Sequence, residues 1–242
     1  MIDKKILINY ATKSETTFIN VLREYAQHIF LREFYGKKDS ENFLFKGGTA
    51  LKLALGSPRF SEDLDFSAKK NSVTYEKILE NVLSGLSNEG IRVNLRESKS
   101  TSGGHLASIE VQLFDQSIEI QNQISFRPQT KLIAENIMIA SAIAPSYNIY
   151  LLDRKLLVTE KLTALLDRAK ARDFFDLYFI LRKDELRPLL RLNNNQRKGV
   201  LESLNKLKKD RLSFELKRFL PKSYWSIVND LPSALKKELA RA

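Results

Sequence analysis

The sequence contains no cysteine, and His28 and His105 are its only histidines. Disulfide bonds and thiolate-ligated metal sites are therefore excluded, and a histidine-rich zinc site is not expected. Any metal ion must be held mainly by oxygen atoms, which Mg²⁺ and Mn²⁺ prefer. The chain also lacks an apolar run of the roughly 18 residues that a membrane-spanning helix needs. Its first residues show no secretory signal, so a cytoplasmic protein without a membrane partner is expected.

The chain does have an excess of positive charge. Its 40 Lys and Arg residues outnumber its 29 Asp and Glu residues, which makes the formal net charge +11 over 242 residues. Such a field attracts polyanions, RNA among them. A lysine-rich proteome produces the same excess without any nucleic-acid partner, so charge by itself does not identify RNA.

The pattern of apolar residues changes along the chain. From about Phe43 to Phe126 short alternating segments are mixed with turns, and from about Leu151 onwards apolar residues recur with a helical period. We therefore expect an α+β fold, with a mixed sheet and flanking helices in residues 1–145 and a helical domain in residues 146–242. The individual segments expected are strands at Ser61–Ala68, Ile91–Leu95, Ile109–Phe114 and Ile118–Phe126, and helices at Ala50–Leu55 and Tyr75–Leu86.

Two carboxylates lie two residues apart in the first of these strands. Asp63 and Asp65 project from one face, with Cα atoms about 7 Å apart, while Leu64 and Phe66 anchor the opposite face. Like charges at this separation repel each other, and a divalent cation between them relieves the repulsion. The pair is therefore a candidate Mg²⁺ site for phosphoryl-transfer chemistry.

A glycine turn precedes this strand. Gly47 and Gly48 allow backbone N–H groups to approach a triphosphate, Thr49 can cap the following helix and offer its hydroxyl, and Lys46 adds a cation. Alone, a Gly-Gly-Thr string is more often a simple turn with a helix cap, and an Asp-x-Asp pair is more often a solvated strand face. Their combination over some fifteen residues favours a nucleotide site.

The strings Lys46–Leu51 (KGGTAL) and Phe60–Phe66 (FSEDLDF) resemble the AbiEii/AbiGii-type toxin branch of the polymerase-β-like nucleotidyltransferases. The resemblance implies a nucleotidyltransferase-like sheet in which a Gly-Ser/Thr turn and Ser61 bind the nucleoside triphosphate. It also implies that Asp63 and Asp65 bind the metal ions.

The same resemblance implies a third carboxylate on a neighbouring strand. Glu119 is our candidate as both a catalytic residue and a metal ligand, because its apolar neighbours face the core and leave it on the open side. Glu110 and Asp115 are the competing candidates.

Two later motifs also match the family. Lys161 follows Glu160 on a predicted helix, and residues 172–178 read RDFFDLY. The resemblance implies that Lys161, Arg172 and Asp173 bind the nucleotide and that Asp176 is catalytic. The two aspartates share one helix face, where they can hold Lys161 or orient Arg172. An ordinary salt-bridge network is the alternative.

The resemblance implies a Mg²⁺- or Mn²⁺-dependent nucleotidyltransferase that acts as a toxin, with an antitoxin protein as partner and RNA, first of all the 3′ end of tRNA, as acceptor. The alternatives are a transferase of a small hydroxylated molecule and a nucleotide- or nucleic-acid-binding module without turnover. The basic charge argues mildly against a cationic small substrate. The basic run Lys206–Arg211 is interpreted as a solvated helix face, with an RNA-binding strip as the alternative.

Overall fold

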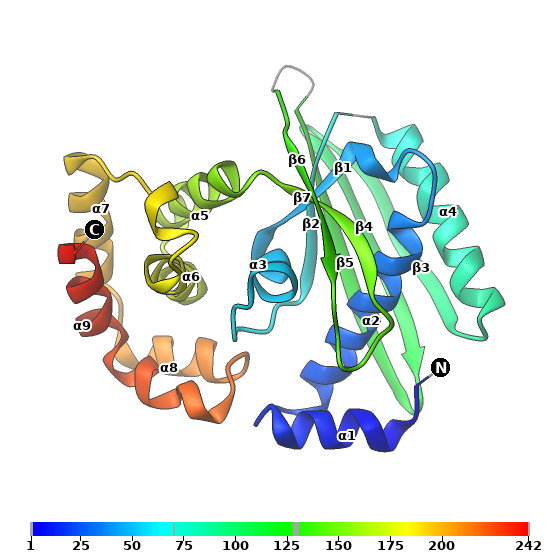
Figure 1. The fold of residues 1–242 in the computed structure, drawn as a ribbon, viewed down its shortest axis with the longest axis horizontal. Helices are drawn as coiled ribbons and strands as arrows, with labels where there is room; N and C mark the ends of the chain where they lie inside the picture. Colours follow the sequence, from blue (N-terminus) through cyan, green and yellow to red (C-terminus); the bar gives the residue numbers. More distant parts are fainter. Residues whose placement is uncertain (1, 70, 128–130, 242) are drawn as a thin grey trace. The chain divides into compact units, whose positions relative to one another are not determined.

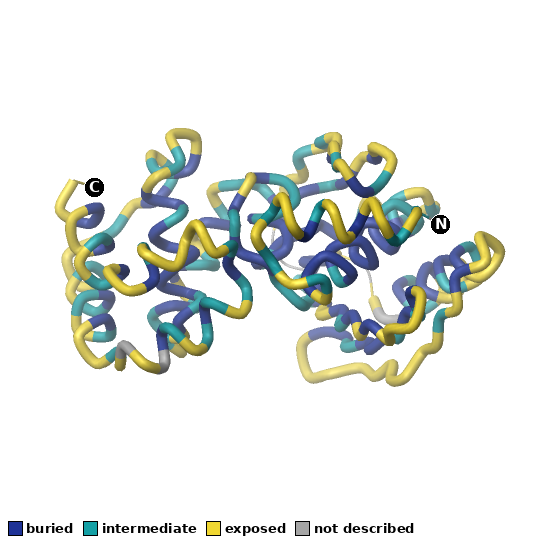
Figure 2. Tube along the Cα trace, turned by 90° about the horizontal axis from the view of Figure 1, so that it is seen from below, coloured by how far each residue is buried: buried dark blue, intermediate teal, exposed yellow. Residues whose placement is uncertain are grey.

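The computed structural model describes residues 2–69, 71–127 and 131–241 (Figure 1). The chain forms two compact units, one of Met1–Gly56 with Phe60–Leu152 and the other of Ser57–Arg59 with Asp153–Ala242. In each unit buried segments alternate with exposed ones along the chain (Figure 2).

The first unit is built on a seven-stranded sheet with the order β3-β4-β5-β2-β1-β7-β6. The pairs β2–β5 and β1–β7 are parallel and the other pairs are antiparallel, so the predicted mixed sheet is confirmed. The strands are β1 (Phe43–Lys46), β2 (Asp63–Ala68), β3 (Arg92–Thr101), β4 (Gly104–Leu113), β5 (Gln116–Phe126), β6 (Ala134–Ile139) and β7 (Tyr147–Leu152).

Aromatic side chains join this sheet to two helices. The ring of Phe34 on α2 lies 5.2 Å from the ring of Phe66 on β2 and 6.4 Å from that of Tyr75 on α4, measured between centroids. Leu64 and Phe66 are fully buried, so this face of β2 is the one that the helices cover. The helices of the first unit are α1 (Lys4–Lys13), α2 (Phe18–Tyr35), α3 (Gly47–Leu55) and α4 (Ser72–Asn88).

The structure extends several predicted segments and adds strands that the pattern did not indicate. The segment expected at Ile91–Leu95 continues as β3 to Thr101. The segments expected at Ile109–Phe114 and Ile118–Phe126 become the antiparallel pair β4–β5, which turns at residues 114–115. Strand β1 was not predicted because all four of its residues are buried, so its side chains show no polar alternation. Strand β7 belongs to the sheet, and the compact units therefore divide at 152/153, whereas the expected division was at 145/146.

The second unit is helical in the part of the chain that the structure describes, as its periodicity predicts. Helix α6 packs against α5, α8 and α9, and most of its side chains are buried. The helices are α5 (Arg154–Arg168), α6 (Ala171–Arg182), α7 (Asn194–Asn205), α8 (Lys209–Lys217) and α9 (Trp225–Arg241). None of the helices in the described ranges has the length and apolar character needed to cross a membrane.

Candidate active site

Strand β2 presents its two aspartates on the face opposite the covered one. Asp63 is in register with Gln121 of β5, and Asp65 is in register with Gln123. Residues in register on neighbouring strands share a face of the sheet, and side chains two residues apart on one strand do so too. Asp63, Asp65 and Glu119 therefore lie on the same face, as predicted.

The glycine turn lies directly against this carboxylate pair. Gly47 has a φ of +83°, and a Cβ atom built there would lie 2.0 Å from Oδ2 of Asp65. Lys46, which is in register with Asp65, is the N-cap of α3, and the helix starts at Gly47. The expectation that Thr49 caps the helix is therefore wrong. The turn needs glycine because the Asp65 carboxylate occupies the space of a side chain.

Substitution of the glycines separates this contact from backbone strain. Gly90→Ala introduces a side chain at φ +78° in open space and should lower the free energy of unfolding by about 1–2 kcal/mol. Gly103→Ala, also in open space and with no such φ, should have almost no effect. Gly47→Ala should cost more than Gly90→Ala because it also displaces Asp65. Equal denaturant midpoints for Gly47→Ala and Gly90→Ala would contradict the proposed contact.

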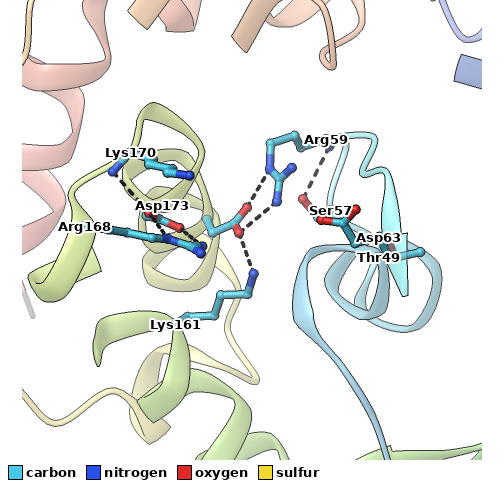
Figure 3. Close-up of polar contacts among 9 residues, drawn as sticks. Thr49, Ser57, Arg59, Asp63, Lys161, Arg168, Lys170 and Asp173 are labelled. Carbon is cyan, nitrogen blue, oxygen red and sulfur yellow. Dashed lines mark hydrogen bonds and ion pairs between the residues drawn. The ribbon is translucent and has the colours of Figure 1, made fainter. Parts of the chain in front are cut away.

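Thr49 connects the turn to the carboxylate strand. Its side chain is fully buried, and Oγ1 donates a hydrogen bond of 2.5 Å to the backbone oxygen of Asp63 (Figure 3). This bond fixes the start of β2 against α3, so the hydroxyl positions Asp63. A phosphate can reach the hydroxyl only by replacing that bond, and a role of Thr49 in triphosphate binding stays a prediction.

A pocket of about 200 Å³, which we call the Asp63 pocket, opens beside the strand. It is lined by Arg23, Glu62, Asp63, Glu119 and Gln121. The pocket brings together one of the predicted aspartates and the predicted third carboxylate. Arg23 and Glu62 were not predicted to belong to it.

Helix α2 supplies two residues of the candidate site that the sequence pattern did not indicate. Gln27 Nε2 donates to the backbone oxygens of Ser61 and Glu62 at 2.9 and 3.1 Å, which holds the segment leading into β2. Arg23, one helical turn earlier, lies 3.3 Å from a Glu62 carboxylate oxygen, and its buried Nε has no hydrogen-bond partner in the described structure. The only sequence signal for these residues was their four-residue spacing, which any helix face shows.

The three candidates for the third carboxylate have different surroundings. Glu119 lines the Asp63 pocket and accepts a hydrogen bond of 2.5 Å from Ser108. Glu110 is held by Arg96, and hydrogen bonds from that residue, then from Ser117 and Asn94, lower its pKa to about 2. Asp115 pairs with Lys4. The pocket therefore favours Glu119.

The carboxylates fit a metal ion that the substrate helps to bind. Among the described residues, no three His, Cys, Asp or Glu side chains form a ready-made metal cluster. Mg²⁺ at phosphoryl-transfer sites is usually held by one or two carboxylates together with substrate phosphates and water. Asp63 and Asp65, on one face beside the glycine turn, provide such a pair.

A buried polar network supports α3 from below the turn. Lys52 Nζ lies 3.2 Å from Oε2 of Glu24 and 3.7 Å from the ring centroid of Phe60. Burial raises the pKa of Glu24, but His28 and Lys52 outweigh it and the net shift is downward. Because Glu24 stays ionised, it holds Lys52 and with it the helix that follows Gly47.

In the helical unit, Asp176 binds two cations. Arg59 donates to its two carboxylate oxygens at 2.8 and 2.9 Å, and Lys161 Nζ lies 2.8 Å from Oδ2 (Figure 3). Burial raises the pKa of Asp176, but the charges of Arg59 and Lys161 prevail and lower it to about 2. Lys161 is therefore held by Asp176, as one of the predicted arrangements has it, and Arg59 is a partner that the sequence did not indicate.

Asp173 has a different set of contacts. Its carboxylate accepts hydrogen bonds from Arg168 at 2.7 and 2.9 Å and from the backbone N–H of Lys170 at 3.2 Å (Figure 3). Asp173 therefore caps the N-terminus of α6. The partly exposed Arg172 takes part in neither the contacts of Asp173 nor those of Asp176. These contacts match the salt-bridge alternative, and nucleotide binding by Arg172 and Asp173 stays a prediction.

The chain matches the model of one known protein family. A family model described as nucleotidyl transferase AbiEii toxin of type IV toxin–antitoxin systems matches residues 29–226. Among curated protein sequences, none matches the chain significantly.

Solved structures share the fold of the whole chain. JHP933 from Helicobacter pylori superposes with a TM-score of 0.58 at 20% identity, covering 93% of this chain and 95% of that one. MenT4, a nucleotidyltransferase toxin from Mycobacterium tuberculosis, superposes with a TM-score of 0.61 at 18% identity, covering 100% and 93%. At these identities the likeness shows a common fold.

Proposed function

Because the chain belongs to the AbiEii family of nucleotidyltransferase toxins from type IV toxin–antitoxin systems, we propose that it transfers a nucleoside monophosphate from a nucleoside triphosphate to RNA. The reaction depends on Mg²⁺ or Mn²⁺, and the 3′ end of tRNA is the first acceptor to test. An antitoxin protein is the expected partner, as the family description implies.

The arrangement of Asp63 and Asp65 is the observation that supports this proposal most. The two carboxylates share a face of β2. Gly47 of the glycine turn lies against Asp65, and the Asp63 pocket opens beside Asp63. Buried apolar side chains on the opposite face keep the strand rigid. A rigid pair of carboxylates beside a glycine turn suits the positioning that phosphoryl transfer requires.

In the proposed reaction the acceptor hydroxyl attacks the α-phosphorus of the triphosphate. A phosphorus–oxygen bond forms to the acceptor, the bond to pyrophosphate breaks, and the hydroxyl proton leaves. Divalent cations, when bound, offset the negative charge of the phosphates. Asp63 and Asp65 would hold these cations, and Glu119 would serve as a third ligand or accept the proton. Lys46 and Arg23 place positive charge beside the reacting phosphates.

A labelling assay tests the proposal. The purified protein is incubated with Mg²⁺, each α-labelled nucleoside triphosphate in turn, and total RNA, with parallel reactions that contain EDTA or lack RNA. Label in RNA of tRNA size, dependent on metal, is the expected result. It would identify the donor and the acceptor class together.

The two alternatives give other results in the same assay. Label in a small product, formed without RNA, would favour a transferase of a small hydroxylated molecule. Binding of the triphosphate without transfer under any condition would favour a binding module. Either result would overturn the RNA acceptor.

A further inference from the structure

The net positive charge of the protein comes from one of its two units. The first unit contains 17 Lys and Arg residues and 17 Asp and Glu residues, so its formal net charge is zero. The helical unit contains 23 basic and 12 acidic residues and therefore carries the entire +11. A proteome-wide preference for lysine would raise the charge of both units, so the division indicates a function of the helical unit.

The helical unit also has a pocket with basic walls, which we call the basic pocket. Its volume is about 470 Å³, and it lies where α5 and α7 end. The lining residues are Arg168, Ala169, Ser203, Lys206, Leu207 and Lys208. Lys209 and Arg211 continue the same basic run in sequence, but their side chains lie outside the described part of the structure.

The cations of the basic pocket differ in their partners. Arg168 forms an ion pair of 2.7 Å with Asp173. Lys206 and Lys208 are exposed, and within the described ranges neither side chain forms a hydrogen bond or an ion pair. The two lysines are therefore available to a ligand, while Arg168 has a structural task as well.

Local helix stability explains one of these lysines and leaves the other unexplained. Lys206 follows the last turn of α7, where a cation interacts favourably with the helix dipole. Lys208 is the N-cap of α8, with φ −76° and ψ 132°, and forms no capping hydrogen bond. Ser, Thr, Asp or Asn would cap this helix, and a cation at a helix N-terminus is unfavourable. Lysine at position 208 therefore makes α8 less stable than a capping residue would, and such a local cost is typical of a functional position.

We propose that the basic pocket binds phosphate groups of the RNA acceptor, with Lys206 and Lys208 as the contacting residues. This inference rests on the proposed function. Lys, Arg and Ser side chains are among the groups that contact phosphates in nucleic-acid complexes, and the pocket offers each type. Lysine is depleted in protein–protein interfaces, and the pocket lacks the aromatic anchors that such interfaces favour. An acidic protein is therefore the less favoured occupant.

A matched pair of double variants tests the proposal. Lys206→Gln/Lys208→Ser removes two charges from the pocket, and Lys236→Gln/Lys237→Gln removes two exposed charges from α9 of the same unit. Binding of fluorescently labelled bulk tRNA is measured by anisotropy over a series of salt concentrations. The pocket variant should bind about tenfold more weakly at low salt, and its log–log salt slope should fall by about two. The α9 variant should keep the slope of the wild type.

A melting experiment separates loss of contacts from loss of structure. Because serine caps a helix better than lysine, Lys208→Ser should raise the melting temperature while it weakens tRNA binding. A variant that binds more weakly because it is misfolded would show a lower melting temperature instead.

Three results would overturn the proposal. Equal weakening in both double variants would indicate a diffuse field, and unchanged binding in the pocket variant would exclude the contact. If the pocket variant lost binding to polyglutamate, a probe for an acidic protein, and still bound tRNA, the pocket would be assigned to an acidic protein. Normal tRNA binding without nucleotide transfer would refute the proposed function alone, so the two failures are distinguishable.

Discussion

Replacing Asp63 with asparagine should reduce nucleotide transfer by about 10²- to 10³-fold or more, the range for loss of one preorganised electrostatic group. Asparagine has nearly the same shape, and the backbone oxygen of Asp63 continues to accept the hydrogen bond from Thr49. The substitution therefore removes one negative charge from the metal-binding pair without disturbing the junction of α3 and β2. The measurement is transfer of label under the conditions that are optimal for the wild type.

Two controls make this prediction specific. Glu80→Gln removes the same charge from an exposed side chain of α4, the helix that packs on the opposite face of the sheet, and should leave transfer unchanged. The melting temperature of Asp63→Asn should stay close to that of the wild type, because Asp63 is not part of the apolar core. Retention of more than about a tenth of the activity would be incompatible with Asp63 as an essential ligand.

Replacing Asp176 with alanine should lower the free energy of unfolding by about 3–5 kcal/mol. The side chain of Asp176 is 1% exposed, and its partners Arg59 and Lys161 are 5% and 12% exposed. Alanine leaves both cations buried without their counter-ion, and the desolvation of those charges is then uncompensated. Denaturant unfolding, followed by circular dichroism, measures the loss.

The control for Asp176 removes the buried charges together. In Arg59→Met/Lys161→Met/Asp176→Leu the stranded cations disappear, and most of the stability should return, because apolar replacements of buried ion pairs are often neutral. A loss below about 1 kcal/mol in Asp176→Ala would contradict the buried network.

The pH dependence of the free energy of unfolding also tests the contribution of ionised Asp176. The pKa of Asp176 is lowered from 3.8 to about 2 in the folded state, so its stabilisation is present above 3.8 and is lost as the pH falls towards 2. In Asp176→Ala the free energy of unfolding should therefore lack this part of its decrease at acid pH.

Local patterns in the sequence were sufficient for the carboxylate strand. A strand has a side-chain period of two, so apolar Leu64 and Phe66 determine that Asp63 and Asp65 share the open face. The same alternation predicted the segments that form β4 and β5 and placed Glu119 on the face away from the core. The helical character of the C-terminal part followed from its apolar period.

Residues that act across long sequence separations were beyond this reasoning. Gln27 holds the segment before β2 across 34 and 35 residues, and Arg59 meets Asp176 across 117. A periodic pattern shows which face of an element is buried but not which element covers it. The local sequence around Arg23 and Arg59 therefore does not indicate which residues they contact.

The sequence by itself identified the carboxylate pair and the glycine turn of the candidate site, because the residue types of the turn and strand and their spacing are local properties. Only the tertiary structure decided that Gly47 makes room for Asp65, that Thr49 holds Asp63, and that the net charge belongs entirely to the helical unit. These features depend on which residues meet in space. Contacts of that kind arise from the packing of distant segments, and no local period encodes them.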